Sequence, residues 1–428
     1  MRIPPLLQPP KPIQIILNVY PVLLCTLLLL WMPEGYRALG EHKFMLYRIL
    51  TLAALGLCVV LMLADRSEER EQKPSLFDAL LLACALAQVL CFVFSADRGV
   101  SLFGIDGWRD GLFTELSFLL LAYFYAHFFR PAKHLRLLLL IGPAVVFLLT
   151  AGQCVLFPDP HRLYYSTIGN NNWYAGFLSV SLPAGVALLL AKQKRSKAER
   201  ALLVLYLMLA LVSCVLVKSM SVILFLVPLA VLAVLFRFSV SGNEALAANA
   251  RRLFTLAVYA IVPVCVLTLL LQLVYPFSDL FGSGRGVIWN AARQLLQTFS
   301  VRQWLFGTGQ DLFYQATCAD AAIHAQLESV FPGFRVTNAH AELLHMLVTQ
   351  GLAGVCTYLA LLFYTLKRAL KELYVENRTV ALCCILVIAS YLATGTVTFR
   401  HVLSAPFVYM LAGVCWGSDA SAFTGSSR

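Results

Sequence analysis

One segment of the chain, TNAHAELLHMLVTQGLAG at positions 337–354, places titratable side chains at the start of an apolar run. These side chains are His340, Glu342 and His345. A neutral imidazole at position 340 can accept a proton from a hydroxyl nucleophile, which makes His340 a candidate general base. The competing interpretation is a histidine that caps a helix or lies at a membrane interface. His345 comes one helical turn later, and we expect it to pack or form hydrogen bonds inside the protein.

The spacing of the two histidines argues against a metal site. His340 and His345 are five residues apart, about 140° around a helix, so they do not share one face. A zinc-binding HExxH motif would place them four residues apart. The twelve cysteines include no CxxC pair, and nearly all of them lie in apolar segments. We therefore expect no metal ion.

A glycine-rich segment, GSGRGVIWNAARQ at positions 282–294, surrounds Arg285 and leads into a helical pattern. The guanidinium group of arginine binds phosphate or carboxylate oxygens in a bidentate manner. A helix start offers unpaired backbone N–H groups, and glycines allow an anion to approach the backbone closely. The segment therefore predicts an anion site, and the alternative is an ordinary glycine-rich turn into a helix.

Two further polar segments precede apolar runs. FGIDGWRDGLF contains Arg109, and TIGNNNWYAGF contains Asn170 and Asn172. Carboxamides and aromatic faces suit sugars, but asparagine also caps helices, and Trp and Tyr also occupy membrane interfaces. We expect these residues to line one substrate-binding site together with Glu342, because the polar segments precede spans on the same side of the membrane.

The composition indicates what kind of protein must position these residues. Of the 428 residues, 60% are hydrophobic and 13% are charged, whereas soluble domains are about half apolar and about a quarter charged. This predicts an all-α polytopic membrane protein. The net charge of +11 does not predict nucleic-acid binding, because the basic residues form short clusters between apolar runs, as in the loops of membrane proteins. We expect membrane lipids as partners, and no nucleic acid.

Apolar runs long enough to cross the bilayer as helices, about 20 residues each, predict the transmembrane spans. The twelve runs lie near residues 13–33, 45–64, 76–95, 111–129, 135–157, 172–191, 201–217, 220–238, 253–275, 341–366, 379–399 and 402–417. The first run lacks a small-residue cleavage site, so we interpret it as a span rather than a signal peptide.

The distribution of the 33 Lys and Arg residues favours an orientation with both termini in the cytoplasm. Residues 418–428 have the composition of a disordered tail.

One long loop, residues 276–340, separates the spans of residues 1–275 from those of residues 341–417. In the favoured orientation this loop is extracytoplasmic. Loops of this length in compact proteins are usually functional or disordered. Helical apolar spacing predicts one helix at 287–299 and a second helix, lying on the membrane surface, at 310–331. The loop is therefore interpreted as an ordered, functional element.

Four segments resemble motifs of the O-antigen ligase and O-antigen polymerase superfamily of membrane glycan transferases, in the family's order. SLFGIDGWRDGLF is similar to a G-x-x-R-x-x-G-type motif before an early span, and GNNNWYAGFL is similar to a G-N-x-N-x-x-A/G motif. SGRGVIWNAARQLL with WLFGTGQDLF resembles an S-G-R…W…G-x-G loop motif. NAHAELLHMLVTQGLAG resembles an A-H-N-x-x-L helix motif that ends in G-x-x-G.

This resemblance implies an all-helical fold of the class C glycosyltransferase type in a bacterial cytoplasmic membrane. It implies a metal-independent transferase without a cofactor, whose donor is a glycan on undecaprenyl diphosphate and whose acceptor is a glycan or lipid hydroxyl. Arg285 would grip the diphosphate, and His340 would act as a base or orient the acceptor. Such an enzyme would ligate or polymerise cell-surface polysaccharide.

The sequence departs from the family's pattern at two positions. Ala341 stands where the family usually has asparagine, and Met220 stands where a second arginine is often found. Lys218 and Arg109 are candidates to supply the missing positive charge, which adds Lys218 to the expected substrate-binding residues.

Two other function classes stay open. Many spans with both ends inside also fit a transporter or flippase for lipid-linked sugars, although paired halves and broken midplane helices are not evident in the sequence. A non-catalytic membrane assembly protein is the other alternative, and it would tolerate Met220 and Ala341.

Overall fold

The computed structural model describes residues 10–64, 74–107, 109–159, 161–191, 195–374 and 378–417. Helices make up 77% of the structure, and the described residues form no β-strand. The all-α fold class is therefore confirmed. The expected disordered tail, residues 418–428, lies outside the described residues.

The helical elements follow one another with short connections. In chain order they are α1 (Lys11–Leu23), η1 (Leu24–Leu28), α2 (Leu39–Ala64), α3 (Leu76–Val93), α4 (Arg98–Phe103), α5 (Leu112–His127), α6 (Leu135–Leu156), η2 (Ser166–Ile168), α7 (Asn171–Leu190), α8 (Lys197–Leu216), α9 (Met220–Ser239), α10 (Glu244–Val274), α11 (Phe281–Gln297), α12 (Val301–Phe306), α13 (Phe313–Cys318), α14 (Ala321–Val330), α15 (Glu342–Leu373), α16 (Arg378–Gly395) and α17 (Ala405–Trp416).

Nine helices in the described ranges are long and apolar enough to cross a membrane, counting α1 with η1 as one. Three shorter apolar helices, α5, α16 and α17, coincide with the predicted spans near 111–129, 379–399 and 402–417. This is the architecture of a polytopic membrane protein. The total of twelve spans stays a prediction, because these three helices contain fewer apolar residues than the roughly 20 that a bilayer crossing needs.

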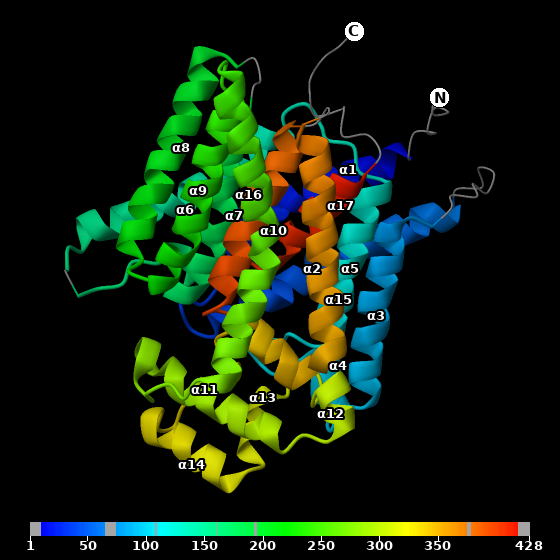
Figure 1. Cartoon of the computed structure of the whole chain (residues 1–428), viewed down its shortest axis with the longest axis vertical. Coiled ribbons are helices and arrows are strands. Elements are labelled where there is room, and N and C mark those ends of the chain that lie inside the picture. The colour runs from blue at the N-terminus through cyan, green and yellow to red at the C-terminus, as the bar shows by residue number, and fades with distance from the viewer. Residues whose placement is uncertain are drawn as a thin grey trace.

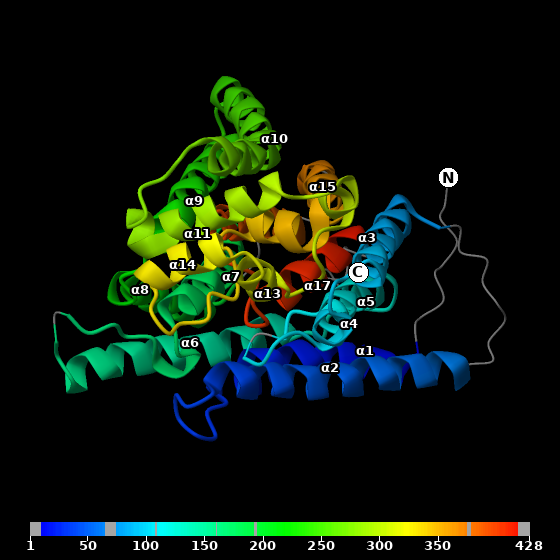
Figure 2. The ribbon, with the colours of Figure 1, turned by 90° about the horizontal axis from the view of Figure 1, so that it is seen from below.

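The helices of the long loop gather at one end of the bundle (Figure 1). α11, α12, α13 and α14 lie at that end, and α3, α10 and α15 run from it along the long axis. The first residues of α1 and the last of α17 lie at the opposite end. Seen along the long axis, α1, α2 and α6 form a layer on one side of the bundle (Figure 2), where α1 packs against both α2 and α6.

α16 forms the centre of the bundle, where it packs against α7, α9, α15 and α17. Its side chains from residue 379 onward are nearly all buried, as expected for a helix that is apolar on every face. α8 and α10 instead expose many large apolar side chains, including Leu205 and Leu267. Such exposure is what lipid contact requires, so α8 and α10 line the surface while α16 holds the core.

A single glycine interrupts α15 at the point where α12 crosses it. Gly351 has φ +66° and ψ −169°, outside the helical region. A Cβ at this position would lie 2.5 Å from backbone atoms of Leu305 and Phe306. The nearby carbonyls of Val348 and Thr349 accept hydrogen bonds from the 307–309 turn. Glycine is therefore required here both for the backbone conformation and for the close approach of α12.

The long loop is helical, as expected, but its second half is divided. The predicted helix at 287–299 lies within α11 apart from its last two residues. The predicted single surface helix at 310–331 is wrong, because the segment forms α13 and α14 with a break between them. The carboxylate of Asp320 accepts hydrogen bonds from the N–H groups of Ala322 and Ile323 and so starts a new helix. Gln310 is fully buried rather than lying on the surface.

Candidate functional site

A left-handed turn places His340 just before α15. Its φ angle is +47°, and its backbone N–H donates to Oδ1 of Asn338 at 3.0 Å. The indole Nε1 of Trp289 in α11 donates to the carbonyl of Ala339 at 3.1 Å. Left-handed backbone is uncommon for residues other than glycine, so these contacts hold the turn in place. The position of His340 is therefore set jointly by α11 and α15.

Three consecutive left-handed residues, 282–284, precede Arg285 at the start of α11. A Cβ at Gly284 would lie 2.4 Å from the ring of Phe331, and a Cβ at Gly286 would lie 1.8 Å from a backbone carbonyl oxygen. Both glycines therefore serve packing of the protein against itself. The expectation that they open the backbone to an anion is not supported at either position, because protein atoms fill that space.

The guanidinium group of Arg285 joins three segments that are distant in sequence. Nε donates to the carbonyl of Val397 at 2.9 Å, Nη1 donates to the carbonyl of Gly282 at 2.6 Å, and Nη2 donates to Oδ1 of Asn172 at 3.1 Å. Arginine has five N–H donors. Within the described part of the chain, the other two have no hydrogen-bond partner. Burial lowers the pKa of Arg285 from its ordinary value.

His340 lies close enough to Arg285 for their charges to interact. Burial, and then the charge of Arg285, lower the pKa of His340 to about 3. Its ring packs edge-on against Phe399, with the ring centroids 5.2 Å apart. Among the described residues, its buried Nδ1 has no hydrogen-bond partner. At neutral pH His340 is therefore an uncharged imidazole within electrostatic range of the Arg285 cation.

The segment 396–404, between α16 and α17, contacts both of these residues. The carbonyl of Val397 accepts from Arg285, and the ring of Phe399 packs on His340. The ring of His401 stacks on Trp173 of α7, with centroids 4.5 Å apart. Sequence reasoning gave this segment no role. The available signal was the presence of two ionisable residues, Arg400 and His401, between two short apolar runs. Ionisable residues at membrane depth are candidates for functional sites.

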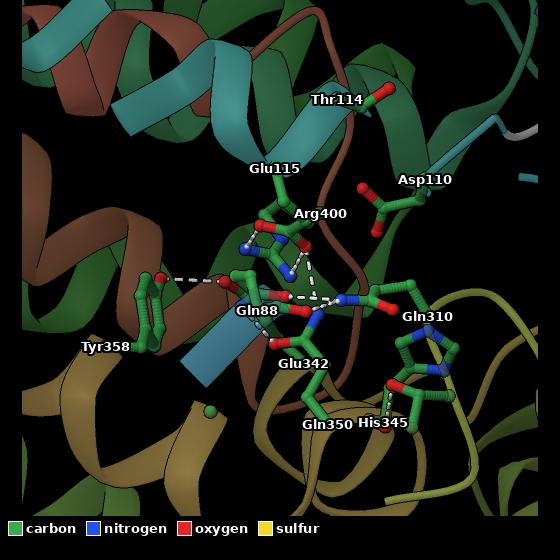
Figure 3. A network of polar contacts seen from close by, with 12 residues as sticks. Gln88, Asp110, Thr114, Glu115, Gln310, Glu342, His345, Gln350, Tyr358 and Arg400 are labelled. Atoms are coloured by element: carbon green, nitrogen blue, oxygen red, sulfur yellow. Dashed lines mark hydrogen bonds and ion pairs between the residues drawn. The ribbon is translucent and has the colours of Figure 1, made fainter. Parts of the chain in front are cut away.

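A buried ion pair joins Arg400 of the 396–404 segment to Glu115 of α5 (Figure 3). Nη1 of Arg400 donates to Oε2 of Glu115 at 2.9 Å, and Nη2 lies 2.5 Å from Oε1. Both side chains are 3% exposed. Because Glu115 belongs to α5 and Arg400 to the 396–404 segment, the pair ties that segment to the core.

Three glutamines extend the ion pair into a chain of hydrogen bonds. Gln350 of α15 donates to Oε1 of Glu115 at 2.9 Å, and Gln88 of α3 donates to Gln350 at 2.9 Å. Gln310 of the long loop donates to the carbonyl of Gln88 at 2.7 Å. Buried polar groups of this kind are stable only when they are paired. The network therefore fixes α3, α5, α15 and the 307–312 turn relative to one another.

Glu342 lies in the buried polar region around the Arg400–Glu115 pair, and not among the residues that contact Arg285. Its Oε1 accepts from the hydroxyl of Tyr358 at 2.7 Å and from that of Tyr391 at 3.4 Å, and the residue is 4% exposed. His345 is buried in the same region, as expected, and packs on Phe313 with centroids 5.8 Å apart. The structure thus gives the predicted substrate-binding Glu342 a set of protein partners.

The two candidates for the missing cation also have partners in the protein. Arg109 donates from Nε to Glu41 at 3.0 Å and forms an ion pair with Asp106. The hydrogen bond to Glu41 is the main cause that raises the pKa of Arg109. Lys218 donates to the carbonyl of Arg162 at 3.1 Å. The structure does not bring either side chain into contact with Arg285.

The two predicted asparagines have different roles at the start of α7. Oδ1 of Asn170 accepts from the N–H groups of Asn172 and Trp173, which is the capping role weighed as the alternative. The Asn172 side chain points instead to Arg285. The structure therefore brings together Arg285, Asn172 and His340 from the predicted set, and adds Val397 and Phe399 to them. These five residues are called the Arg285 layer below.

Comparison with known proteins gives no assignment: no protein-family model matches the sequence, and no curated protein matches it significantly. Among the described residues, no group of three or more His, Cys, Asp and Glu side chains lies so that it could hold a metal ion. The chemistry of the site therefore has to be argued from an arginine, an imidazole and a carboxamide.

Proposed function

We propose that this chain is a membrane glycan transferase of the O-antigen ligase or polymerase type. The observation that carries the proposal is the Arg285 layer, in which Arg285 contacts Asn172 and lies within electrostatic range of His340. These three residues come from three of the four motifs that resemble the family. The proposed donor is a glycan on undecaprenyl diphosphate, and the proposed acceptor is a glycan or lipid hydroxyl at the outer face of a bacterial cytoplasmic membrane.

In the proposed reaction, the acceptor oxygen forms a bond to the anomeric carbon of the donor. The bond between that carbon and the diphosphate oxygen breaks, and the diphosphate leaves with the bonding electron pair. The two remaining N–H groups of Arg285 bind the diphosphate, since a fixed cation stabilises charge that develops on a leaving group. The proton of the acceptor hydroxyl passes to the imidazole of His340.

An imidazole with a pKa of about 3 is a weak proton acceptor, so His340 fits the proposed role only when the donor is bound. The causes of this low pKa are burial and the charge of Arg285. A bound diphosphate pairs with Arg285 and adds negative charge, and both effects raise the pKa of a nearby imidazole. The donor would thus convert a weakly basic histidine into a better proton acceptor at the moment when the acceptor binds.

The decisive experiment is a reaction of the purified protein with an undecaprenyl-diphosphate-linked oligosaccharide and a candidate acceptor. The length and linkage of the product distinguish polymerisation from ligation. We expect product with the unaltered chain, and loss of product with Arg285→Ala and with His340→Ala. Arg302→Ala and His324→Ala are matched controls, because they remove the same residue types from the same loop outside this layer. All variants must show the elution profile of the unaltered protein.

Other outcomes would replace the proposal. Movement of a fluorescent lipid-linked sugar across proteoliposomes, without formation of a glycosidic bond, would support the transporter or flippase class. Full transferase activity in both alanine variants would mean that the chemistry lies elsewhere in the protein. No reaction and no transport, with normal assembly of surface polysaccharide by the two variants in cells, would favour a non-catalytic assembly role.

A further inference from the structure

A large apolar cavity, partly open to the surface, lies between the helices of the bundle, away from the Arg285 layer. Its volume is about 210 Å³, larger than the cavity of about 150 Å³ that binds benzene in a protein interior. Its walls come from α1, η1, α5, α6, α7, α8, α16 and α17, and are formed mainly by aliphatic and aromatic side chains such as Leu139, Ala184, Val387 and Met410. A hydrocarbon chain is the ligand that such walls favour, because they offer contact without polar partners.

The cavity belongs to the end of the bundle opposite to the long loop. The residues that α16 contributes, from Thr379 to Val387, lie in its first turns, whereas the last turn of α16 leads to the 396–404 segment. The residues that α6 contributes, from Leu135 to Pro143, also lie in its first half. α7 begins beside Arg285, and the cavity reaches its last turns at Leu188. In the favoured orientation this end faces the cytoplasm.

Positive charge is concentrated at the rim of the cavity. Arg136 lines the cavity itself. Arg195 follows α7, whose last turns line the cavity. Burial, and then the charge of Arg136, lower the pKa of Arg195. Among the described residues that act on Arg195, Arg200 adds a positive charge and Glu199 a negative one. Positive charge at the membrane surface favours an anion.

From the apolar walls and this rim together we infer that the cavity is a binding site for an anionic phospholipid of the adjacent leaflet. An acyl chain fills the cavity between α6, α7, α16 and α17, and the phosphate lies against Arg136 and Arg195. Basic pockets between transmembrane helices on the cytoplasmic side are typical binding sites for anionic headgroups. The inference does not depend on the proposed transferase activity, since the site lies at the other end of the bundle.

The test uses native mass spectrometry of the full chain in mild detergent, with phosphatidylglycerol and phosphatidylcholine of identical acyl chains as probes. We expect the unaltered protein to retain phosphatidylglycerol in preference to phosphatidylcholine. The double variant Arg136→Gln/Arg195→Gln removes the rim charges and leaves the cavity, so it should reduce the preference roughly thirtyfold, as expected from two basic residues near a headgroup. Arg302→Gln/Arg335→Gln in the long loop is the matched control.

A second variant tests the cavity itself. Ala184→Phe fills it, and should reduce retention of both lipids, whereas Leu205→Phe on the exposed face of α8 should reduce neither. Size-exclusion profiles establish that each variant is folded. Equal retention of phosphatidylglycerol by the unaltered chain and by both site variants would overturn the inference. Preferential retention of undecaprenyl phosphate over phosphatidylglycerol would also overturn it, because the occupant would then be a polyprenyl chain.

Discussion

The side-chain oxygen of Asn172 and the guanidinium group of Arg285 form a hydrogen bond of 3.1 Å across 113 positions of sequence. This contact joins the start of α7 to the start of α11. It holds one N–H group of the arginine in a fixed direction and so pre-orients the remaining donors. An anion that binds to Arg285 would have to share the guanidinium group with the Asn172 side chain. A substitution of Asn172 therefore tests the proposed donor site.

We predict that Asn172→Asp raises the KM for the lipid-linked donor roughly tenfold, with a smaller effect on kcat. The new carboxylate would form a charge-assisted hydrogen bond to Arg285, which is about twice as strong as the neutral one, and the diphosphate would have to compete with it. Steady-state kinetics over a range of donor concentrations measure the effect. Asn170→Asp is the matched control, because aspartate caps a helix as well as asparagine does. An unchanged KM in Asn172→Asp would argue against diphosphate binding at Arg285.

Arg285→Lys should be nearly as inactive as Arg285→Ala. The arginine uses three donors in three directions for Val397, Gly282 and Asn172, and needs further donors for a ligand. A lysine ammonium is a single point charge and cannot replace that planar arrangement. We expect a loss of about 10²-fold or more in turnover for both variants, similar to removal of a transition-state donor in other enzymes. Substantial activity of the lysine variant would show that charge alone is sufficient.

The stability of the unliganded protein should fall with decreasing pH because of His340. Its pKa is about 3 in the folded chain and about 6.5 in an unfolded chain, so the unfolded state takes up the proton first as the pH falls. The contribution is complete above about pH 6.5 and declines by at most about 1.4 kcal/mol per pH unit between there and the folded pKa. His340→Gln removes this dependence.

Thermal midpoints of the unaltered chain and of His340→Gln, measured in detergent between neutral and acidic pH, test this prediction. The difference between them should change in favour of the variant as the pH falls. Parallel curves for the two proteins would mean that His340 is not kept neutral by its surroundings.

Removal of one partner from the buried Arg400–Glu115 pair should be more damaging than removal of both. Each of Arg400→Leu and Glu115→Gln leaves its former partner without a buried counterion, and we expect each to cost about 3–5 kcal/mol. The double variant leaves neither charge of the pair behind, so its loss should be smaller than that of either single variant. Thermal midpoints for all four proteins complete a double-mutant cycle. Strict additivity would contradict the ion pair.

Gly351→Ala should destabilise the protein, because both the left-handed φ and the backbone of α12 exclude a Cβ there. Strain of this kind costs about 1–3 kcal/mol before any clash is added. Gly56→Ala in α2 is the matched control, since a Cβ at Gly56 meets no atom within 4 Å. The control should be neutral or slightly stabilising, because alanine is the better helix former. A thermal midpoint of Gly351→Ala equal to that of the unaltered chain would contradict the required close approach.

The sequence by itself determined the all-α class and the approximate position of every apolar helix. A run of about 20 apolar residues is a local signal, and the bilayer makes it a strong one because backbone groups in lipid have to pair within a helix. It also predicted Arg285 and His340 as the candidate catalytic residues at the long loop, and in the structure they lie within electrostatic range of each other. Their residue types and their neighbours within a few positions were sufficient for that prediction.

Only the tertiary structure decided which polar residues meet. Arg109 and Arg285 were both predicted to bind substrate, yet Arg109 is held by Glu41 while Arg285 contacts Asn172. The choice depends on how α2, α7 and α11 pack, which no local pattern encodes. The roles of the 396–404 segment and of Gln310 were not predicted, although Arg400 and His401 offered a local signal in that segment. Their roles arise from partners in α3, α5, α11 and α15 that are distant in the chain, and the direction of a hydrogen bond is fixed only once those helices are in place.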